Sequence, residues 1–420
     1  MKEKIFIKNL CRISAILIIC AAASCKKYNY LGFTPGTGTP TITSVHTLSK
    51  TDSSLYTDTV VTYDASGNPS TTYKYYTNVV VPHDSVVTAG NIGQYYVING
   101  TNLGTTTTVS FNGVSVYFNR GLITDHSIIV SIPSTVPTLG AAATDTLSIV
   151  TLYGKVNYHF TVLTPPPTVT VWSDYDFWSG SQITLTGVGF ASVTSVGLTG
   201  TTATATIVSQ TDAQLVLQFP SATVNRANLV FSYASAGGTA TETSTQELID
   251  LDNAAAVFYN SNFQGSWADN SWSHPSGTST EATHSVPGTA SIRANYPAGA
   301  WQIEGWQDWN ASGGGLAYDA AYKYLTFWVK GGTADHTLVL VGDKLASGYG
   351  QVQLSVAPAI QQILVPKGVW TYYKIPLGSG ANQLNFWATG SPAQQLGFFL
   401  QGQNGDVDEV MYFDEVAFVK

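Results

Sequence analysis

A segment of this chain repeats itself without a gap, and the repeat is the strongest constraint on the fold. Tyr95–Gly113 (YYVINGTNLGTTTTVSFNG) aligns onto Gln182–Gly200 (QITLTGVGFASVTSVGLTG). Each copy is a strand, a glycine turn, a second strand and a second glycine turn. We interpret the glycines that fall in register as turn positions that need a positive φ; the pairs are Gly93 with Gly180, Gly100 with Gly187, and Gly113 with Gly200. Two equivalent β domains in tandem are predicted.

Strand-like patterns continue through the rest of the chain. Short runs rich in Val, Thr, Ile and Tyr alternate with turn residues, and no long segment has the helical period. This pattern predicts an all-β chain built from sandwiches. Pro165-Pro166-Pro167 separates the two copies of the repeat, and the repeat ends near Asp250. We therefore expect domains over residues 41–165, 166–250 and 251–420.

Three phrases of the first copy carry a resemblance to a known family. They are Ile98–Gly104 (INGTNLG), Val109–Gly113 (VSFNG) and Ile128–Pro133 (IIVSIP), and they resemble the IPT/TIG family of immunoglobulin-like (Ig-like) domains. The second copy is more diverged. The first domain also carries an additional stretch, Ser44–Asn91, in which Asp64–Pro69 (DASGNP) is typical of a hairpin tip.

The N-terminal 25 residues have the pattern of a secretory signal peptide. Lys2, Lys4, Lys8 and Arg12 precede the apolar run Ile13–Ala23, and Ala22-Ala23-Ser24-Cys25 resembles a bacterial lipobox. Cleavage before Cys25 would leave it as the only cysteine of the mature protein, since Cys11 and Cys20 precede it. We expect lipidation of Cys25, followed by a flexible spacer over 26–40; the alternative is a plain secretory signal.

The C-terminal segment, 251–420, contains eight of the ten tryptophans. Three of its phrases resemble jelly-roll carbohydrate-binding modules: Leu325–Gly332, Gly368–Leu377 and Tyr412–Phe418. The predicted fold is therefore tandem Ig-like (IPT/TIG) sandwiches followed by a jelly-roll-like β-sandwich. A tryptophan offers an apolar face and an N–H group, which suits the apolar C–H face and hydroxyl rim of a sugar ring.

The order of the domains resembles that of the surface glycan-binding proteins of Bacteroidota polysaccharide utilisation loci. This resemblance implies a non-catalytic outer-membrane lipoprotein that faces outward. It also implies a polysaccharide ligand, held beside a TonB-dependent transporter and its companion lipoprotein. The segment Lys26–Tyr30 (KKYNY) departs from the acidic stretch that often follows the lipidated cysteine in that phylum.

Alternation and loop position select the candidate glycan-binding residues. Trp306 and Trp309 are expected in or beside a loop. Trp301 shares its strand face with Ile303, so its side chain is expected either in the core or against the ligand. Trp387 and Gln353 are expected on the open face of a sheet, and Glu304 is expected to accept hydrogen bonds from sugar hydroxyls. Trp267 and Trp272 lie in a second aromatic loop. Trp328 and Trp370 are interpreted as packing residues.

Other functions find less support in the residues. The net charge is −8, so the composition gives no indication of the basic surface that nucleic-acid binding requires. Glu304 and Asp308 form a carboxylate pair, but hydrolysis of a glycoside needs two acids facing each other across a cleft. No cofactor is expected, although Asp406, Asp408, Asp414 and Glu415 form a candidate structural Ca²⁺ site. The principal alternative function is that of an adhesin or structural surface protein. A β-linked glycan such as xyloglucan, mixed-linkage glucan or mannan is the favoured ligand.

Overall fold

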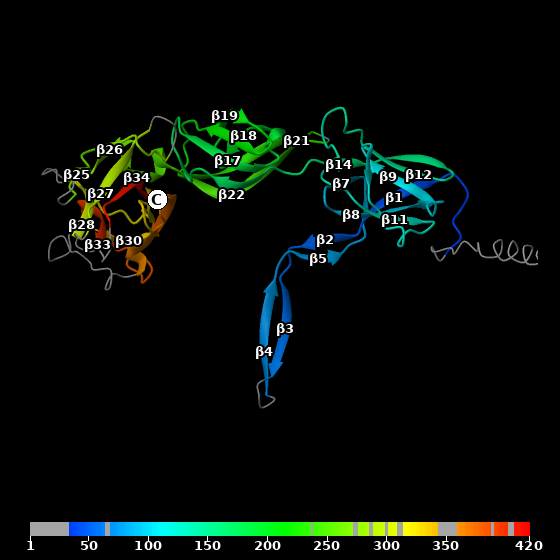
Figure 1. Cartoon of the computed structure of the whole chain (residues 1–420), viewed down its shortest axis with the longest axis horizontal. Coiled ribbons are helices and arrows are strands. Elements are labelled where there is room, and N and C mark those ends of the chain that lie inside the picture. Colours follow the sequence, from blue (N-terminus) through cyan, green and yellow to red (C-terminus); the bar gives the residue numbers. More distant parts are fainter. Residues whose placement is uncertain are drawn as a thin grey trace, which may run out of the picture. The chain divides into compact units, whose positions relative to one another are not determined.

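The computed structural model describes residues 33–63, 68–236, 238–271, 276–284, 289–298, 301–308, 314–342, 359–387, 390–401 and 407–420. These residues form β-strands almost throughout, which confirms the prediction of an all-β chain (Figure 1). Within this part of the chain, no helix combines the length and apolarity needed to cross a membrane. Cys25 and the whole signal segment lie outside the described residues. Two compact units are described separately below: 1–165 with 235–238, and 166–234 with 239–420.

The first unit contains a sandwich of two four-stranded sheets. Its core strands are β1 (Thr41–Thr47), β6 (Val86–Val87), β7 (Ala89–Asn91), β8 (Tyr95–Thr101), β9 (Thr106–Phe111), β10 (Val114–Val116), β11 (Ser127–Ser131), β12 (Thr146–Thr151), β13 (Gly154–His159) and β14 (Thr161–Leu163). One sheet has the order β11-β8-β1-β6 and the other β10-β9-β12-β13, while β7 and β14 pair in parallel. Val45, Ile98, Val109, Phe111 and Phe160 are fully buried between them.

The additional stretch of the first domain forms a long hairpin. Strands β3 (Tyr56–Tyr63) and β4 (Pro69–Tyr76) pair along their whole length and project from the first sandwich (Figure 1). They are joined to it by the paired strands β2 (Ser49–Asp52) and β5 (Val79–Pro82). The predicted hairpin is therefore confirmed, although residues 64–67 at its tip lie outside the described part. All of β4 is exposed.

The second unit begins with the second copy of the repeat. Its strands are β15 (Thr168–Trp172), β16 (Asp176–Phe177), β17 (Gln182–Val188), β18 (Val193–Leu198), β19 (Thr204–Gln210), β20 (Gln214–Gln218), β21 (Arg226–Ser235) and β22 (Gly238–Asp250), with a short 3-10 helix, η1 (Phe190–Ser192). They hydrogen-bond in the order β15-β17-β20-β19-β18-β21-β22-β16. The core between them includes Phe177, Leu185, Phe190 and Phe231.

The repeated glycines have two different roles. Four lie in turns with φ between +76° and +91°, as predicted: Gly93, Gly113, Gly180 and Gly200. Gly100 and Gly187 lie instead within β8 and β17, so a turn is the wrong prediction for this pair. A Cβ on Gly100 would lie 1.9 Å from the carbonyl oxygen of Thr41, and one on Gly187 would lie 1.9 Å from that of Thr168. In both copies, the partner strand carries a bulge there. The glycine permits this close approach of two backbones.

We expect the substitution Gly187→Ala to lower the free energy of unfolding of the second unit by at least about 1–3 kcal/mol, because the added methyl group would overlap the Thr168 carbonyl. Urea unfolding of both proteins measures this difference. Gly197→Ala is the matched control, since the nearest atom to its Cβ would be 3.9 Å away, on Val230. Equal unfolding midpoints for the two variants would refute the steric explanation.

The C-terminal part of the second unit is a two-sheet sandwich. One sheet contains β23 (Ala255–Asn260), β24 (Asn262–Phe263), β26 (Gly277–Ser279), β27 (Ser291–Tyr296), β29 (Tyr324–Lys330), β32 (Trp370–Pro376) and β34 (Glu409–Val419). The other contains β25 (Ala268–Asp269), β28 (Trp301–Gln307), β30 (His336–Val341), β31 (Gln362–Val365) and β33 (Gln395–Gln401). Two single-turn helices complete it, α2 (Leu251–Ala254) and η2 (Ala359–Gln361).

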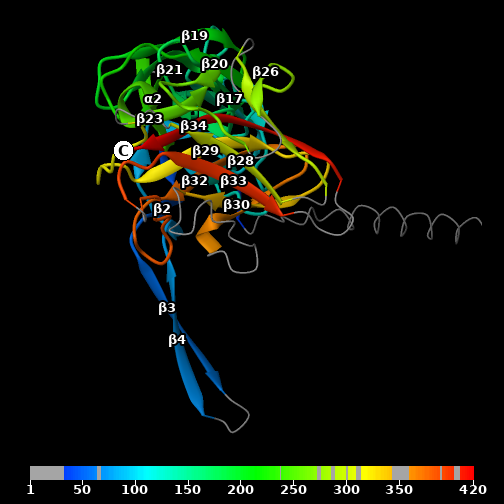
Figure 2. The ribbon, with the colours of Figure 1, turned by 90° about the vertical axis from the view of Figure 1, so that its left-hand side faces the viewer.

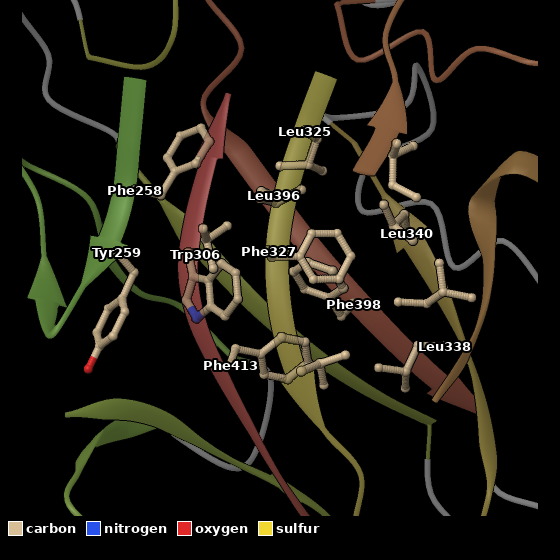
Figure 3. Packing of buried hydrophobic residues seen from close by; sticks show 14 of the residues in the cluster. Phe258, Tyr259, Trp306, Leu325, Phe327, Leu338, Leu340, Leu396, Phe398 and Phe413 are labelled. Atoms are coloured by element: carbon tan, nitrogen blue, oxygen red, sulfur yellow. The ribbon is translucent and has the colours of Figure 1, made fainter. Parts of the chain in front are cut away.

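The two sheets enclose one aromatic core. Strand β34 pairs with β23 and β27 on one side and with β29 on the other, while β33 lies between β28 and β30 (Figure 2). Trp306, Phe327, Phe398 and Phe413 meet between the sheets (Figure 3). The described residues 384–387 form no strand, and Leu384 makes an isolated bridge to Leu377.

Candidate functional site

Trp306 is a core residue rather than an exposed loop residue. It lies in β28, which pairs with β33 through Gln307, and its side chain is 0% exposed. Its ring contacts Phe398 and Phe413, with centroids 5.2 and 5.6 Å away (Figure 3). The loop prediction is wrong because β28 continues to Gln307, and Trp306 is one of its inward-facing residues. Trp306 therefore cannot stack on a sugar while the protein is folded.

Glu304 is also buried. One carboxylate oxygen accepts a hydrogen bond from Ser271 Oγ at 2.8 Å, and the other accepts one from the Asn295 backbone N–H at 3.0 Å. Burial raises the pKa of Glu304 to about 8, against the opposing effect of these hydrogen bonds. With 1% of the residue exposed, Glu304 does not present its carboxylate to a sugar, so the predicted role as a surface acceptor is wrong. Its contact with Asn295 instead links β28 to β27.

Trp387 and Trp267 are half-buried at the margin of the core. The Trp387 indole N–H donates to the Leu316 carbonyl at 2.8 Å, and its ring lies against Phe418. The expectation of an open sheet face at Trp387 is wrong, because the described residues before it, 384–386, form no strand and its ring packs against the core. The Trp267 ring packs edge-on to Phe258, 4.2 Å between centroids. Both tryptophans support the core.

The remaining predicted site residues are not placed by the structure. Trp272, Trp309 and Gln353 lie outside the described residues, and for Trp301 only the backbone, in β28, is described. The residues on either side of the segment 309–313 are joined, because Asp308 Oδ2 accepts a hydrogen bond from the Gly315 N–H at 2.9 Å. The glycan-binding role of Trp272, Trp309, Trp301 and Gln353 stays a prediction.

An aromatic groove lies within the second unit, where the second Ig-like domain meets the C-terminal sandwich. Its volume is about 600 Å³, and it is lined by Trp172, Ser173, Tyr175, His284, Trp328, Trp370, Thr371 and Tyr372. Strand β15 and the residues after it supply one wall, and β29 and β32 supply the other. The rings of Tyr175 and Trp328 are nearly parallel, 5.9 Å apart and inclined by 9°. We call these eight residues the junction groove.

Hydrogen bonds beneath the junction groove hold its two walls together. The Trp328 indole N–H donates to Asp174 Oδ1 at 3.2 Å, and the Tyr372 hydroxyl donates to Asp176 Oδ1 at 2.9 Å. Arg226 of the Ig-like domain donates to the backbone carbonyl of Lys420 through Nε and Nη2. An apolar cluster that includes Ile249, Leu251, Ala417 and Val419 lies at the same junction. Hydrogen bonds and apolar packing between the second Ig-like domain and the C-terminal sandwich therefore hold the two walls of the groove in place.

Two buried carboxyl groups belong to this junction. Burial raises the pKa of Asp174, and the nearby Glu415 raises it further; burial raises that of Asp176, reinforced by Asp174. Asp174 Oδ1 also accepts the backbone N–H groups of Tyr175 and Asp176 at 2.7 and 3.1 Å, which fixes the turn after β15.

The acids predicted to bind Ca²⁺ do not form one group among the described residues. Asp408 accepts a hydrogen bond from the Ala298 N–H at an exposed position, and Asp406 lies outside the described part. Asp414 and Glu415 are buried beside His284. The Ca²⁺ prediction therefore has no support as a single four-acid cluster.

The sequence contained partial signals of the junction groove. Alternation in β29 correctly places Trp328 on the face opposite Leu325, Phe327 and Val329, which are in the core. Sequence alone did not indicate that this face is covered by Tyr175 and His284. The prediction that Trp370 only packs is incomplete, because Trp370 is half-buried and lines the groove.

Comparisons with known proteins agree with the resemblance noted in the repeat. No protein-family model matches the chain. A curated Bacteroides ovatus protein described as IPT/TIG domain-containing is 34% identical over 118 residues, covering 27% of this chain and 24% of that protein. The match thus spans about a quarter of the relative's length.

Similar solved structures include three surface glycan-binding proteins. PbSGBP-B from Prevotella bryantii has 14% identity and a TM-score of 0.49, over 92% of this chain and 99% of that one. SGBP-B from a xyloglucan utilisation locus of Bacteroides uniformis has 16% identity and a TM-score of 0.37, over 79% and 96%. SGBP-B from a Bacteroides ovatus mixed-linkage glucan locus, in complex with a heptasaccharide, has 11% identity and a TM-score of 0.29, over 88% of each chain.

Proposed function

We propose that the protein binds a neutral polysaccharide at the cell surface without catalysing a reaction. The observation that carries this proposal is the junction groove, in which four half-buried aromatic side chains, Trp172, Tyr175, Trp370 and Tyr372, line one depression. Aromatic rings can stack on the apolar faces of sugar rings, and the hydroxyl groups of Ser173 and Thr371 can bond to sugar hydroxyls. Trp272 and Trp309 are proposed as a second contact.

Charge and chemistry support a neutral ligand and a binding role. Among the described residues, the groove is lined by neither Lys nor Arg, so this part of it offers no counter-charge for an anionic polymer. The eight described lining residues include no carboxylate either, whereas glycoside hydrolysis uses a pair of carboxylates on opposite sides of the scissile bond. Glu304, whose pKa is raised to about 8 by burial, is buried away from solvent.

The finer parts of the proposal rest on the resemblance of the domain order. The ligand is proposed to be a β-linked glycan such as xyloglucan, mixed-linkage glucan or mannan. Lipidation of Cys25 would anchor the chain in the outer membrane, and capture beside a TonB-dependent transporter and its companion lipoprotein would serve uptake. Weak stacking at each site suits a polymer, because one chain can engage many copies of the protein.

The test is affinity electrophoresis of purified residues 26–420 in gels cast with xyloglucan, mixed-linkage glucan or mannan. We expect retardation by at least one polymer, and a roughly tenfold weaker affinity for Trp370→Ala, since a stacked ring contributes about 1–2 kcal/mol. Tyr117→Ala removes an aromatic ring that is 82% exposed in the first domain, and it should leave retardation unchanged.

Two outcomes would change the proposal in different ways. Retardation that survives Trp370→Ala but is lost in Trp272→Ala or Trp309→Ala would move the site to the aromatic loops. If no polymer retards the folded protein, the glycan-binding proposal is wrong, and a protein-contacting surface role takes its place.

A further inference from the structure

Three side chains converge behind the junction groove from separate parts of the second unit. A carboxylate oxygen of Asp174, a ring nitrogen of His284 and a carboxylate oxygen of Glu415 all lie within 4.8 Å of one another. His284 Nδ1 is 3.8 Å from Asp174 Oδ2 and 3.6 Å from Glu415 Oε1. These distances are too long for hydrogen bonds. They are close to the roughly 3.3 Å that separates the ligand atoms of a tetrahedral Zn²⁺ with bonds of about 2.0 Å.

His284 Nδ1 is the atom that most strongly indicates a ligand. It is buried and has no hydrogen-bond partner among the described residues, and only 5% of the His284 side chain is exposed. Leaving a buried polar atom without a partner costs free energy. A metal ion bound to His284 Nδ1 would supply that partner.

The surroundings orient two of these ligands. The His284 ring stacks on Trp328, with centroids 3.7 Å apart and planes inclined by 22°. Three N–H groups occupy Asp174 Oδ1, among them the Trp328 indole. Asp174 Oδ2 is the oxygen that faces His284. In protein metal sites, hydrogen bonds to one oxygen of a carboxylate typically orient the other oxygen toward the metal.

The backbone at Glu415 is also adapted to this position. Glu415 has a φ of +51°, a conformation that side chains other than glycine rarely adopt. The ladder between β29 and β34 shifts register there, between Thr326 and Trp328. The bulge lets the neighbouring carboxylates of Asp414 and Glu415 both approach His284. Strained backbone conformations of this kind are concentrated at functional sites, where they position a side chain for binding.

We infer that Asp174, His284 and Glu415 bind one divalent cation of the zinc class, which joins the second Ig-like domain to the C-terminal sandwich. A cation would neutralise part of the negative charge that Asp174, Asp414 and Glu415 bring into the interior. One nitrogen and two oxygen donors favour Zn²⁺ over Ca²⁺, which takes six to eight oxygens. This inference does not depend on glycan binding.

The experiment measures metal content and thermal unfolding of residues 26–420. The protein is stripped with EDTA, incubated with ZnCl₂, desalted and analysed by mass spectrometry for zinc. We expect one zinc per chain and a Tm of the second unit raised by about 5–10 °C. His284→Gln and Asp174→Asn should lose both effects, while His159→Gln, an exposed histidine of the first unit, should keep them.

A second measurement uses the unsubstituted protein, so the test does not depend on the variants folding. Cobalt(II) in place of zinc should give the visible absorption of a tetrahedral site, and zinc should displace it. The inference is wrong if the folded chain binds no zinc, or if both variants retain as much zinc as His159→Gln. If the chain binds no zinc and Asp174→Asn also raises the Tm, a proton shared by Asp174 and Glu415, rather than a metal ion, satisfies these two carboxylates.

Discussion

Replacing Trp306 with alanine should lower the free energy of unfolding of the C-terminal sandwich by about 3–5 kcal/mol, the range for loss of a large aromatic side chain from a packed core. Trp306 has no exposed surface, and its ring touches Phe398 from β33 and Phe413 from β34. Removing it would leave a cavity between both sheets (Figure 3). Guanidinium unfolding followed by circular dichroism measures the change.

Trp306→Phe and Trp370→Ala are the matched comparisons for this prediction. Trp306→Phe keeps an aromatic ring and removes an indole N–H that is buried without a partner among the described residues, so it should cost less than the alanine variant. Trp370→Ala removes a half-buried tryptophan and should cost less still. If Trp306→Ala were as stable as Trp370→Ala, the core position of Trp306 would be wrong. Loss of glycan binding in Trp306→Ala would report unfolding rather than a lost contact.

Much of the architecture could be predicted because it depends on local patterns. The repeated turns at Gly93 and Gly180 need a left-handed backbone, and this requirement is visible in the sequence. Strand β29 places Leu325, Phe327 and Val329 in the core and Trp328 on the opposite face, as the alternation of these residues predicts. Gly100 and Gly187 were assigned wrongly because a glycine in the sequence can mark either a turn or a place where two strands approach closely.

The candidate site was harder to predict because it depends on contacts between distant residues. The hydrogen bond from Trp328 to Asp174 spans 154 residues, and the one from Tyr372 to Asp176 spans 196. Trp306 was misplaced because the polar and glycine-rich residues after it suggested a loop. Its actual position follows from the pairing of β28 with β33, which no local pattern reveals.

The substitution Glu304→Gln should remove a pH dependence from the stability of the second unit. Burial raises the pKa of Glu304 from 4.5 to about 8, so the folded state binds the proton more tightly than the unfolded state. Stability should therefore be highest below the unfolded pKa and should fall as the pH rises from about 4.5 to about 8. Above that window the cost of a buried carboxylate is fully present, roughly 3–5 kcal/mol.

The hydrogen bonds around Glu304 explain why glutamine is the right replacement. Ser271 Oγ lies 2.6 Å from Asp269 Oδ1 and 2.8 Å from Glu304 Oε2, yet it carries one proton. If Ser271 donates to Asp269, a protonated Glu304 can donate to Ser271 in turn, and the amide of glutamine can do the same without a charge. The other oxygen can still accept from Asn295.

The measurement is the free energy of unfolding of both proteins between pH 4.5 and 9, in EDTA so that metal binding does not contribute. Asp174, Asp176 and Asp414 also have raised pKa values, but they are present in both proteins and cancel in the difference. We expect the variant to gain stability relative to the parent as the pH rises, by roughly 3–5 kcal/mol across the window. Glu281→Gln, an exposed substitution, should show no such gain. A difference that stays constant with pH would mean that Glu304 does not hold a proton in the folded protein at neutral pH, and that Ser271 and Asn295 are sufficient to stabilise a buried carboxylate.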